Sequence, residues 1–211
     1  PAGSDIDGTV ASYALGSGVG VGNGALTFNA DGSYSFNPNG NFDTLGVGQS
    51  RDISFTYTAT DNSGGVSLPA TVTITVTGAN DAPTGADASV TIAEDGSRAF
   101  AGADFGFADM DVGDTLAAVR IDSLPSAGTL TLNGSAVAAG QSISAGDLTN
   151  LLFTPAANAN GAPYASFTFS VQDSGGLFDA APNTITLNVT AVNDPPVAVV
   201  TPASGEEDTP I

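Results

Sequence analysis

The sequence predicts an all-β protein made of tandem β-sandwich domains, and three observations lead to this prediction. Apolar and polar residues alternate over short stretches bounded by Gly, Asn, Asp or Pro, as in half-buried strands. No segment sustains a helical period. The tripeptides Ala79-Asn80-Asp81 and Val192-Asn193-Asp194 each end such a stretch, and their aspartates (81 and 194) are 113 positions apart. A repeat of this length is the size of one β-sandwich.

The first repeat shows the alternation in five stretches. Three large apolar side chains share one face in 53–57 and again in 72–76, which is typical of a strand in a two-sheet sandwich. The tripeptide Ala30-Asp31-Gly32 separates two stretches and predicts a hairpin turn. The expected strands are 9–15, 25–29, 33–37, 53–60 and 71–77.

The second repeat shows eight such stretches. Ser144 is an acceptable N-cap, so one helical turn is expected over 144–148. The expected strands are 88–93, 98–107, 116–124, 128–132, 141–143, 151–154, 166–171 and 184–190.

Comparing the repeats suggests where the domains divide. Glu94-Asp95 recurs as Glu207-Asp208 at the same offset of 113, so the tail resembles the opening of a repeat. The first repeat has no counterpart of the two strands that open the second. We therefore expect a first β-sandwich over 1–81 that lacks its two initial strands, a second over 82–194, and over 195–211 a linker with the first strand, from 197 to 200, of a following repeat.

The residue inventory excludes several kinds of catalytic site. The chain has no cysteine, no histidine and no lysine, and its arginines are Arg51, Arg98 and Arg120. Thiol nucleophiles, Ser-His-Asp triads and Schiff-base lysines are therefore impossible, as are metal sites that need nitrogen or sulfur ligands. A pair of catalytic carboxylates would remain possible. Glutamate is scarce, however, and we expect no enzymatic activity.

The net charge of −19 restricts the partners. Binding of nucleic acid needs clustered Arg and Lys, and an anionic membrane surface would repel the chain. No apolar run is long enough to span a bilayer, so membrane insertion is not expected. The many aspartates suit a hard cation instead, because Ca²⁺ takes oxygen ligands from carboxylates, amides and backbone carbonyls. We expect a monomer that binds calcium and its neighbouring repeats.

Several motifs of the second repeat resemble the cadherin-like repeats of bacterial giant adhesins. The segments that carry the resemblance are 109–116, 124–130, 153–155, 167–173 and 192–196. The first repeat, through 24–34 and 77–83, resembles the related VCBS repeat. The resemblance implies immunoglobulin-like extender domains of RTX-type proteins, on the bacterial cell surface or secreted, stiffened by Ca²⁺ at the domain junctions. The glycine-rich RTX nonapeptide is absent, so no RTX β-roll is expected.

Strand direction gathers the acidic residues of the second repeat at its two ends. Successive strands of a sandwich run in opposite directions, so Asp109, Asp111 and Asp173 return to the end where the linker Asn80-Asp81 enters. Any one of these residues could be an ordinary turn residue, but together they would repel one another unless a cation lies among them. Glu94 falls at the opposite end, near the next linker. The expected Ca²⁺ ligands are Asn80, Asp81, Asp109, Asp111 and Asp173 at the first junction, Glu94, Asn193 and Asp194 at the second, and Asp5, Asp7 and Asp61 as the equivalent cluster of the first repeat.

Two other functions remain open. The chain could be a module that binds a carbohydrate or a protein, or an accessory domain of a secreted enzyme. A carbohydrate site would need exposed aromatic side chains on one group of loops, and only Phe178 and Tyr164 are placed for that role. We interpret the other aromatic residues as core, because they alternate with polar ones.

Overall fold

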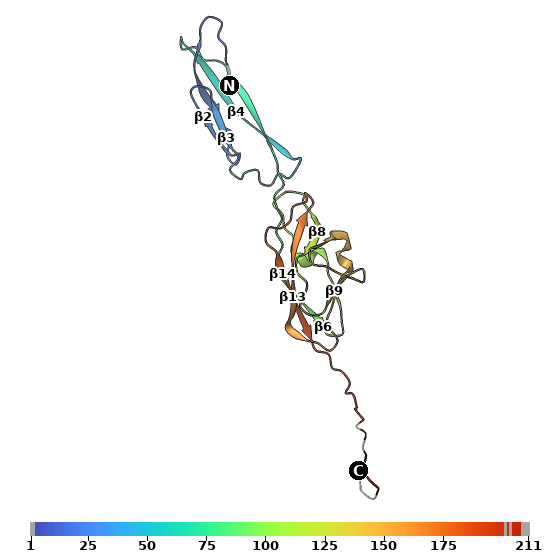
Figure 1. Ribbon diagram of the computed structural model, residues 1–211. Coiled ribbons are helices and arrows are strands. Elements are labelled where there is room, and N and C mark those ends of the chain that lie inside the picture. Colours follow the sequence, from blue (N-terminus) through green and yellow to red (C-terminus); the bar gives the residue numbers. More distant parts are fainter. Residues whose placement is uncertain (1–2, 201, 203, 208–211) are drawn as a thin grey trace.

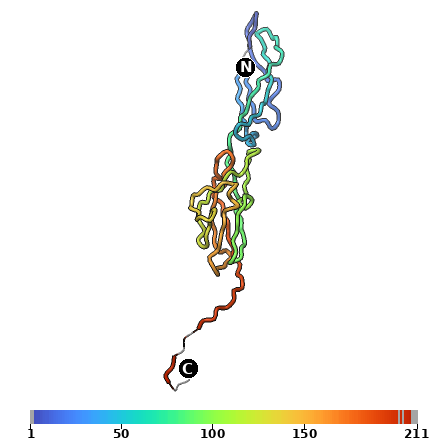
Figure 2. The backbone as a smooth tube through the Cα atoms, turned by 90° about the vertical axis from the view of Figure 1, so that its right-hand side faces the viewer, coloured from blue at the N-terminus to red at the C-terminus, as the bar shows by residue number. Residues whose placement is uncertain are grey.

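The computed structural model describes residues 3–200, 202 and 204–207. Two β-rich units lie end to end and form an elongated molecule, from which the C-terminal segment extends (Figure 1). The view turned by 90° shows the same arrangement (Figure 2). The predicted all-β fold class is confirmed: the described residues form fourteen strands and two short 3₁₀ helices. No helix in this part of the chain has the length and apolar character needed to cross a membrane.

The first unit contains one three-stranded sheet and one hairpin. The antiparallel sheet has the order β1-β4-β5, with β1 at Val10–Ser17, β4 at Ser50–Asp61 and β5 at Ala70–Thr77. The expected hairpin forms from β2 (Ala25–Phe28) and β3 (Tyr34–Asn37).

The hairpin turn closes as the sequence predicts. Gly32 adopts a left-handed conformation with φ 84°, which glycine reaches without the steric penalty of a Cβ. The Asp31 carboxylate accepts hydrogen bonds from the N–H (2.8 Å) and the hydroxyl (2.7 Å) of Ser33.

Aromatic side chains pack the hairpin against the sheet in the first unit. The Phe55 ring is fully buried and meets Tyr34 and Phe28 edge to face, with centroids 5.0 and 5.8 Å apart. The buried apolar side chains of the unit, as far as it is described, are Phe42, Ile53 and Phe55. Many of its other apolar residues, including Leu15, remain exposed, so this core is thin.

The second unit is a complete two-sheet sandwich. One sheet has the order β11-β8-β13-β14-β6, in which β14 pairs antiparallel with β13 and parallel with β6. The other has the order β10-β9-β12-β7. The bounds are β6 Ala88–Ala93, β7 Arg98–Ala99, β8 Leu116–Ile121, β9 Thr129–Leu132, β10 Ser135–Ala136, β11 Gln141–Ser144, β12 Leu151–Thr154, β13 Gly161–Asp173 and β14 Asn183–Thr190.

Phenylalanines of β13 and of the segment that follows β7 pack together in the core of the second unit. Phe105 packs against Phe169 with ring centroids 4.9 Å apart, and Phe100 packs against Phe167 at 5.5 Å. All four rings are at most 1% exposed. These aromatic residues therefore form core, as predicted. Phe178 is half-buried under the Arg120 guanidinium, 4.5 Å from its ring centroid.

Two expected strands differ from the structure. Only Arg98–Ala99 of the expected strand 98–107 pairs with a neighbour, because the chain then turns into the 3₁₀ helix η1 (Gly102–Phe105). The Asp104 carboxylate accepts the Ala101 N–H (2.8 Å), and Gly106 ends the turn with φ 59°. The expected strand at 197–200 is absent, and these residues are exposed. Asp208, part of the repeated Glu-Asp pair, lies outside the described residues.

The helical turn expected after Ser144 is present as the 3₁₀ helix η2 (Ala145–Asn150). The Ser144 side chain does not cap the helix backbone; its hydroxyl instead donates to the Asp147 carboxylate (2.7 Å). Leu148 of this helix is fully buried and belongs to the core of the second unit.

Candidate metal centre at the junction of the two units

A short linker joins the units, and both ends of it are held by hydrogen bonds. The Gly78 N–H donates to the Gln49 carbonyl (2.9 Å) at the end of the first unit. On the other side, Thr84 and Ala108 form an isolated antiparallel bridge. The Gly85 N–H donates to the Asp179 carboxylate (2.7 Å). The linker therefore lies along the end of the second unit.

The loop between η1 and β8 brings three carboxylates together. One ligand oxygen from each of Asp109, Asp111 and Asp114 lies within 4.8 Å of the others. The loop folds back because the Asp109 carboxylate accepts the Asp111 N–H (2.9 Å) and the Asp111 carbonyl accepts the Asp114 N–H (3.2 Å). We refer to Asp109, Asp111 and Asp114 as the acidic cluster.

Each carboxylate of the acidic cluster has a buried oxygen without a partner. These atoms are Oδ2 of Asp109, Oδ1 of Asp111 and Oδ2 of Asp114. Asp111 is only 3% exposed. An anionic oxygen removed from water without a hydrogen bond or counter-charge is strongly unfavourable, so a cation bound among these three atoms would be stabilising.

The linker contacts this group directly. The Asp81 N–H donates to Oδ2 of Asp111 (2.8 Å), while the Asp81 side chain is exposed. The Asn80 side-chain amide donates to Oδ2 of Asp173 (2.9 Å). A Cβ added at Gly175 would lie 1.7 Å from Oδ1 of Asn80. The turn after β13 therefore needs glycine at this position for the Asn80 side chain to fit.

Asp173 and Ser174 support the cluster from the neighbouring turn. Asp173 is fully buried, and its other oxygen accepts the Leu177 N–H (2.8 Å). Both oxygens of Asp173 thus have protein donors. The Ser174 hydroxyl donates to Oδ1 of Asp114 (3.0 Å), which leaves only Oδ2 of Asp114 without a partner.

The structure thus gathers all five residues expected at this junction, with different roles. Asp109 and Asp111 present free oxygens, Asp81 contributes its backbone, and Asn80 and Asp173 bond to each other. Asp114 was not among the expected ligands, although strand direction places it at the same end. The signal for it is its position three residues after Asp111 in the same loop.

The acidic cluster fits a hard cation. All its side-chain donors are carboxylate oxygens, the ligands that Ca²⁺ prefers. Among the described residues, the ion pairs join Arg98 to Asp104 and Arg120 to Asp122, so no arginine neutralises the cluster. The Arg51 guanidinium donates to the carbonyls of Gly22 and Asn41 instead.

The first unit also contacts the cluster loop. The Val112 N–H donates to the Thr44 carbonyl (3.1 Å), and the Gln49 side-chain amide donates to the Val112 carbonyl (3.1 Å). A Cβ added at Gly46 would lie 3.3 Å from Cβ of Asp111. The two units are therefore bonded to each other through Val112, inside the loop that carries the acidic cluster.

At the opposite end of the second unit, Glu94 holds the next linker. Glu94 is 5% exposed; its Oε1 accepts the Val192 N–H (2.7 Å) and its Oε2 accepts the Asn160 amide (3.3 Å). Asn193 and Asp194 are exposed and lie next to this contact in the chain. In the part of the chain that the structure describes, no group of three acidic side chains gathers here.

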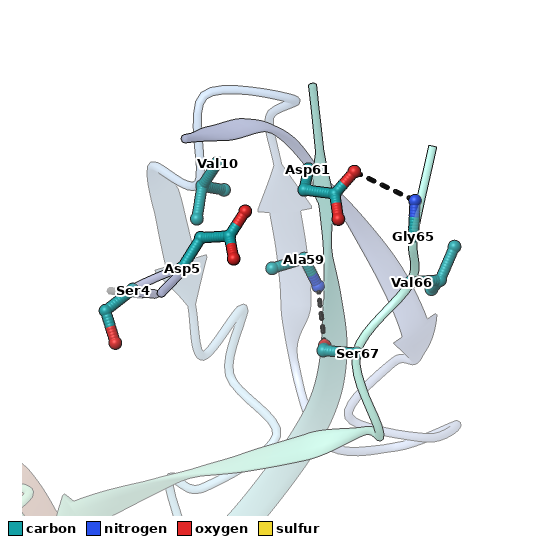
Figure 3. Close-up of a pocket in the computed structure, with 8 residues that line it drawn as sticks. All are labelled: Ser4, Asp5, Val10, Ala59, Asp61, Gly65, Val66 and Ser67. Atoms are coloured by element: carbon teal, nitrogen blue, oxygen red, sulfur yellow. Dashed lines mark hydrogen bonds between the residues drawn. The ribbon is translucent and has the colours of Figure 1, made fainter. Parts of the chain in front are cut away.

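In the first unit, Asp5 and Asp61 line one pocket, whereas Asp7 is exposed and is not among its lining residues (Figure 3). Oδ1 of Asp61 already accepts the N–H groups of Ser63 (2.6 Å) and Gly65 (2.9 Å). The pairing of β1 with β4 thus brings Asp5 and Asp61 to one end of the unit. The three expected residues, Asp5, Asp7 and Asp61, do not form a compact cluster there.

Comparison with known families identifies both units. Residues 80–190, more than half of the chain, match the family "Bacterial Ig domain". The chain belongs to the bacterial Ig domain family. Residues 2–78 match the family "Bacterial cadherin-like domain". The predicted cadherin-like and immunoglobulin-like repeats are thus confirmed, and the more specific VCBS and RTX assignments stay predictions. No curated protein matches this bacterial Ig domain chain.

Similar solved structures are extracellular cadherin domains. Domains 1–4 of protocadherin gamma B7 align with 88% of the chain at 13% identity and a TM-score of 0.48. Domains EC1–4 of Drosophila N-cadherin align with 84% at 12% identity and a TM-score of 0.49. The chain covers 43% and 42% of those two structures, so it spans less than half of their length.

Proposed function

We propose that this chain is an extender segment of a large bacterial adhesin, on the cell surface or secreted, and that Ca²⁺ at the junction stiffens it. The observation that carries the proposal is the acidic cluster with its three buried, unpartnered oxygens, which lies where the linker meets the second unit. The end-to-end arrangement of the two units (Figure 1) suits a spacer. The cadherin-like and Ig-like family matches support an adhesion-type module outside the cell.

The residues that would hold the ion are the acidic cluster and its linker neighbours. Asp109, Asp111 and Asp114 supply negative charge. Asp81 and the Asn80 side chain are within reach of the same loop through their bonds to Asp111 and Asp173. A bound cation would neutralise the repulsion within the loop, while the bonds of Asn80 and Asp81 hold the linker beside the acidic cluster. In its specific form, the proposal is that the first unit is a VCBS-type repeat and that the parent protein is an RTX-type adhesin.

We propose no enzymatic role. The carboxylates that gather at the junction bond to backbone N–H groups and to the linker, as in a structural site. A module for carbohydrate binding has less support, because Phe178 is half-buried under Arg120 and the Tyr164 hydroxyl accepts the Ala156 N–H (3.1 Å).

Small-angle X-ray scattering of the chain tests the mechanical part of the proposal. In Ca²⁺ we expect a narrow distance distribution with the maximum dimension of an extended particle, and in chelator a broader one. Gln49→Ala removes one bond across the junction without touching the cluster, so in Ca²⁺ it should broaden the distribution less than chelator does. Identical profiles with and without Ca²⁺ would leave the ion without an effect on the junction and would refute the stiffening.

A further inference from the structure

The chain contains a single side chain that peroxides oxidise readily. It has one methionine, Met110, and no cysteine, tryptophan or histidine. Thioethers and thiols are the groups that mild oxidants attack, and exposure favours the reaction. Met110 is 59% exposed, so a small oxidant can reach it. Any oxygen that a dilute peroxide adds to this chain should therefore be found at one residue.

Met110 lies where the linker meets the acidic cluster. It stands between Asp109 and Asp111, and the hydrogen bond from the Asp111 N–H to the Asp109 carboxylate spans it (2.9 Å). Met110 also lines a hollow at the surface. The residues around this hollow are Ala82, Thr84, Ala108, Asp109 and Met110. Two of them, Ala82 and Thr84, belong to the linker, so the methionine is in a position to influence how the linker is held.

The hollow lies beside the backbone bridge that fastens the linker to the second unit. The Thr84 N–H donates to the Ala108 carbonyl (2.8 Å), and the Ala108 N–H donates to the Thr84 carbonyl (2.9 Å). Both residues also line the hollow. The exchange rates of these two amides therefore report how often the linker leaves its place on the second unit.

We propose that Met110 is an oxidation site and that its sulfoxide loosens the linker. The oxidant is a hydroperoxide, ROOH. The Met110 sulfur attacks the terminal oxygen, an S–O bond forms as the O–O bond breaks, and ROH leaves with the proton. Sulfur loses two electrons and the peroxide gains them, so methionine becomes methionine sulfoxide. The reaction needs no calcium, and the inference does not rest on the calcium proposal.

The sulfoxide fits this place less well than the thioether. Methionine is a flexible apolar side chain, and oxidation makes it polar. The new oxygen carries partial negative charge on a residue that stands between two members of the acidic cluster. A polar group kept from water without a hydrogen bond is unfavourable, so the oxidised side chain turns toward water and uncovers the hollow. The bridge between Thr84 and Ala108 then opens more often.

Hydrogen exchange of the intact chain, followed by NMR in chelator, tests the proposal. Dilute hydrogen peroxide should add one oxygen, which mass spectrometry of peptides locates at residue 110. The Thr84 and Ala108 amides should then exchange about tenfold faster or more, which corresponds to about 1.4 kcal/mol less protection. Amides in the core strand β13, such as that of Phe167, should keep their rates. Unchanged rates at Thr84 and Ala108 in the oxidised chain would overturn the proposal, as would an equal acceleration in β13.

A matched variant separates oxidation of Met110 from other effects of peroxide. Met110→Ile keeps an apolar side chain without sulfur, and the first repeat carries isoleucine, Ile6, between its own two aspartates. Peroxide should leave both the mass of this variant and its Thr84 and Ala108 exchange unchanged. In the oxidised natural chain, methionine sulfoxide reductases should restore the original rates. Acceleration by peroxide in the Met110→Ile chain would refute the proposal.

Discussion

Replacing Asp111 by asparagine should have opposite effects on stability with and without calcium. The three carboxylates of the acidic cluster have oxygens within 4.8 Å of one another. At an effective dielectric constant of about 20, two unit charges at that distance repel by about 3 kcal/mol. Asparagine keeps the shape of the side chain and a carbonyl oxygen for the Asp81 N–H, but removes one of the three charges.

In chelator, Asp111→Asn should therefore raise the free energy of unfolding of the second unit by about 1–3 kcal/mol, since part of the repulsion is screened. In Ca²⁺ the same change removes a charged ligand, so the dissociation constant should rise by about tenfold to a thousandfold, or about 1.4–4 kcal/mol. Thermal melts in EDTA and in millimolar Ca²⁺, with calorimetric titration, measure both effects.

Asp31→Asn is the matched control, because Asp31 lies in the exposed β2–β3 turn. It should leave the calcium titration unchanged. If Asp111→Asn lowered stability equally in EDTA and in Ca²⁺, the negative charge would act only by strengthening the hydrogen bond from the Asp81 N–H. The reasoning from unpartnered oxygens would then be wrong.

Three further predictions follow from the described contacts. Calcium at about one hundred times its dissociation constant should raise the free energy of unfolding of the chain by about 2.7 kcal/mol. Mg²⁺ demands strict octahedral geometry and should not stabilise the chain. Equal shifts of the melting temperature with the two ions would contradict this prediction. Gly175→Ala should displace the Asn80 side chain from Asp173 and destabilise the second unit by about 1–3 kcal/mol, whereas Gly146→Ala, with no atom near its added Cβ, should not. The Ser33 hydroxyl and N–H hold the pKa of Asp31 below its ordinary value, so Ser33→Ala should raise that pKa in an NMR titration; the stabilisation is present above the unfolded pKa and is lost as pH falls through the folded one.

Strands with regular alternation were predictable from the sequence, whereas the path of the chain between them was predictable only in part: the hairpin turn at 30–32 and the helical turn after Ser144 were expected, but the turn into η1 was not. β5 and β14 alternate polar residues, mostly Thr, with aliphatic ones, and both lie close to their expected positions. The segment 98–107 also contains regularly placed apolar residues. There, however, the bond from Ala101 to Asp104 and the freedom of Gly106 favour a tight turn. Local side-chain bonding of this kind competes with strand pairing.

The sequence allowed us to predict which residues gather at the candidate site, but not the role of each residue in it. Strand direction alone is enough to gather Asp109, Asp111 and Asp173 at one end of the sandwich. It cannot tell a free carboxylate from one whose oxygens are both used, as in Asp173, because that depends on the neighbouring turn. Asp114 illustrates the opposite case, because the sequence did not single it out as a ligand. Its Oδ2 is buried and has no hydrogen-bond partner, and neither property can be recognised from the sequence.

The bonds through Val112 change how the molecule can move as a mechanical rod. A single covalent linker leaves two bodies free to twist about it and to bend in every direction. The contacts of Val112 with Thr44 and Gln49 add a second point of attachment beside the linker. Two separate points oppose twisting and leave bending mainly about the line that joins them. In an array of such units, each junction would transmit torque along the chain and flex in one preferred plane.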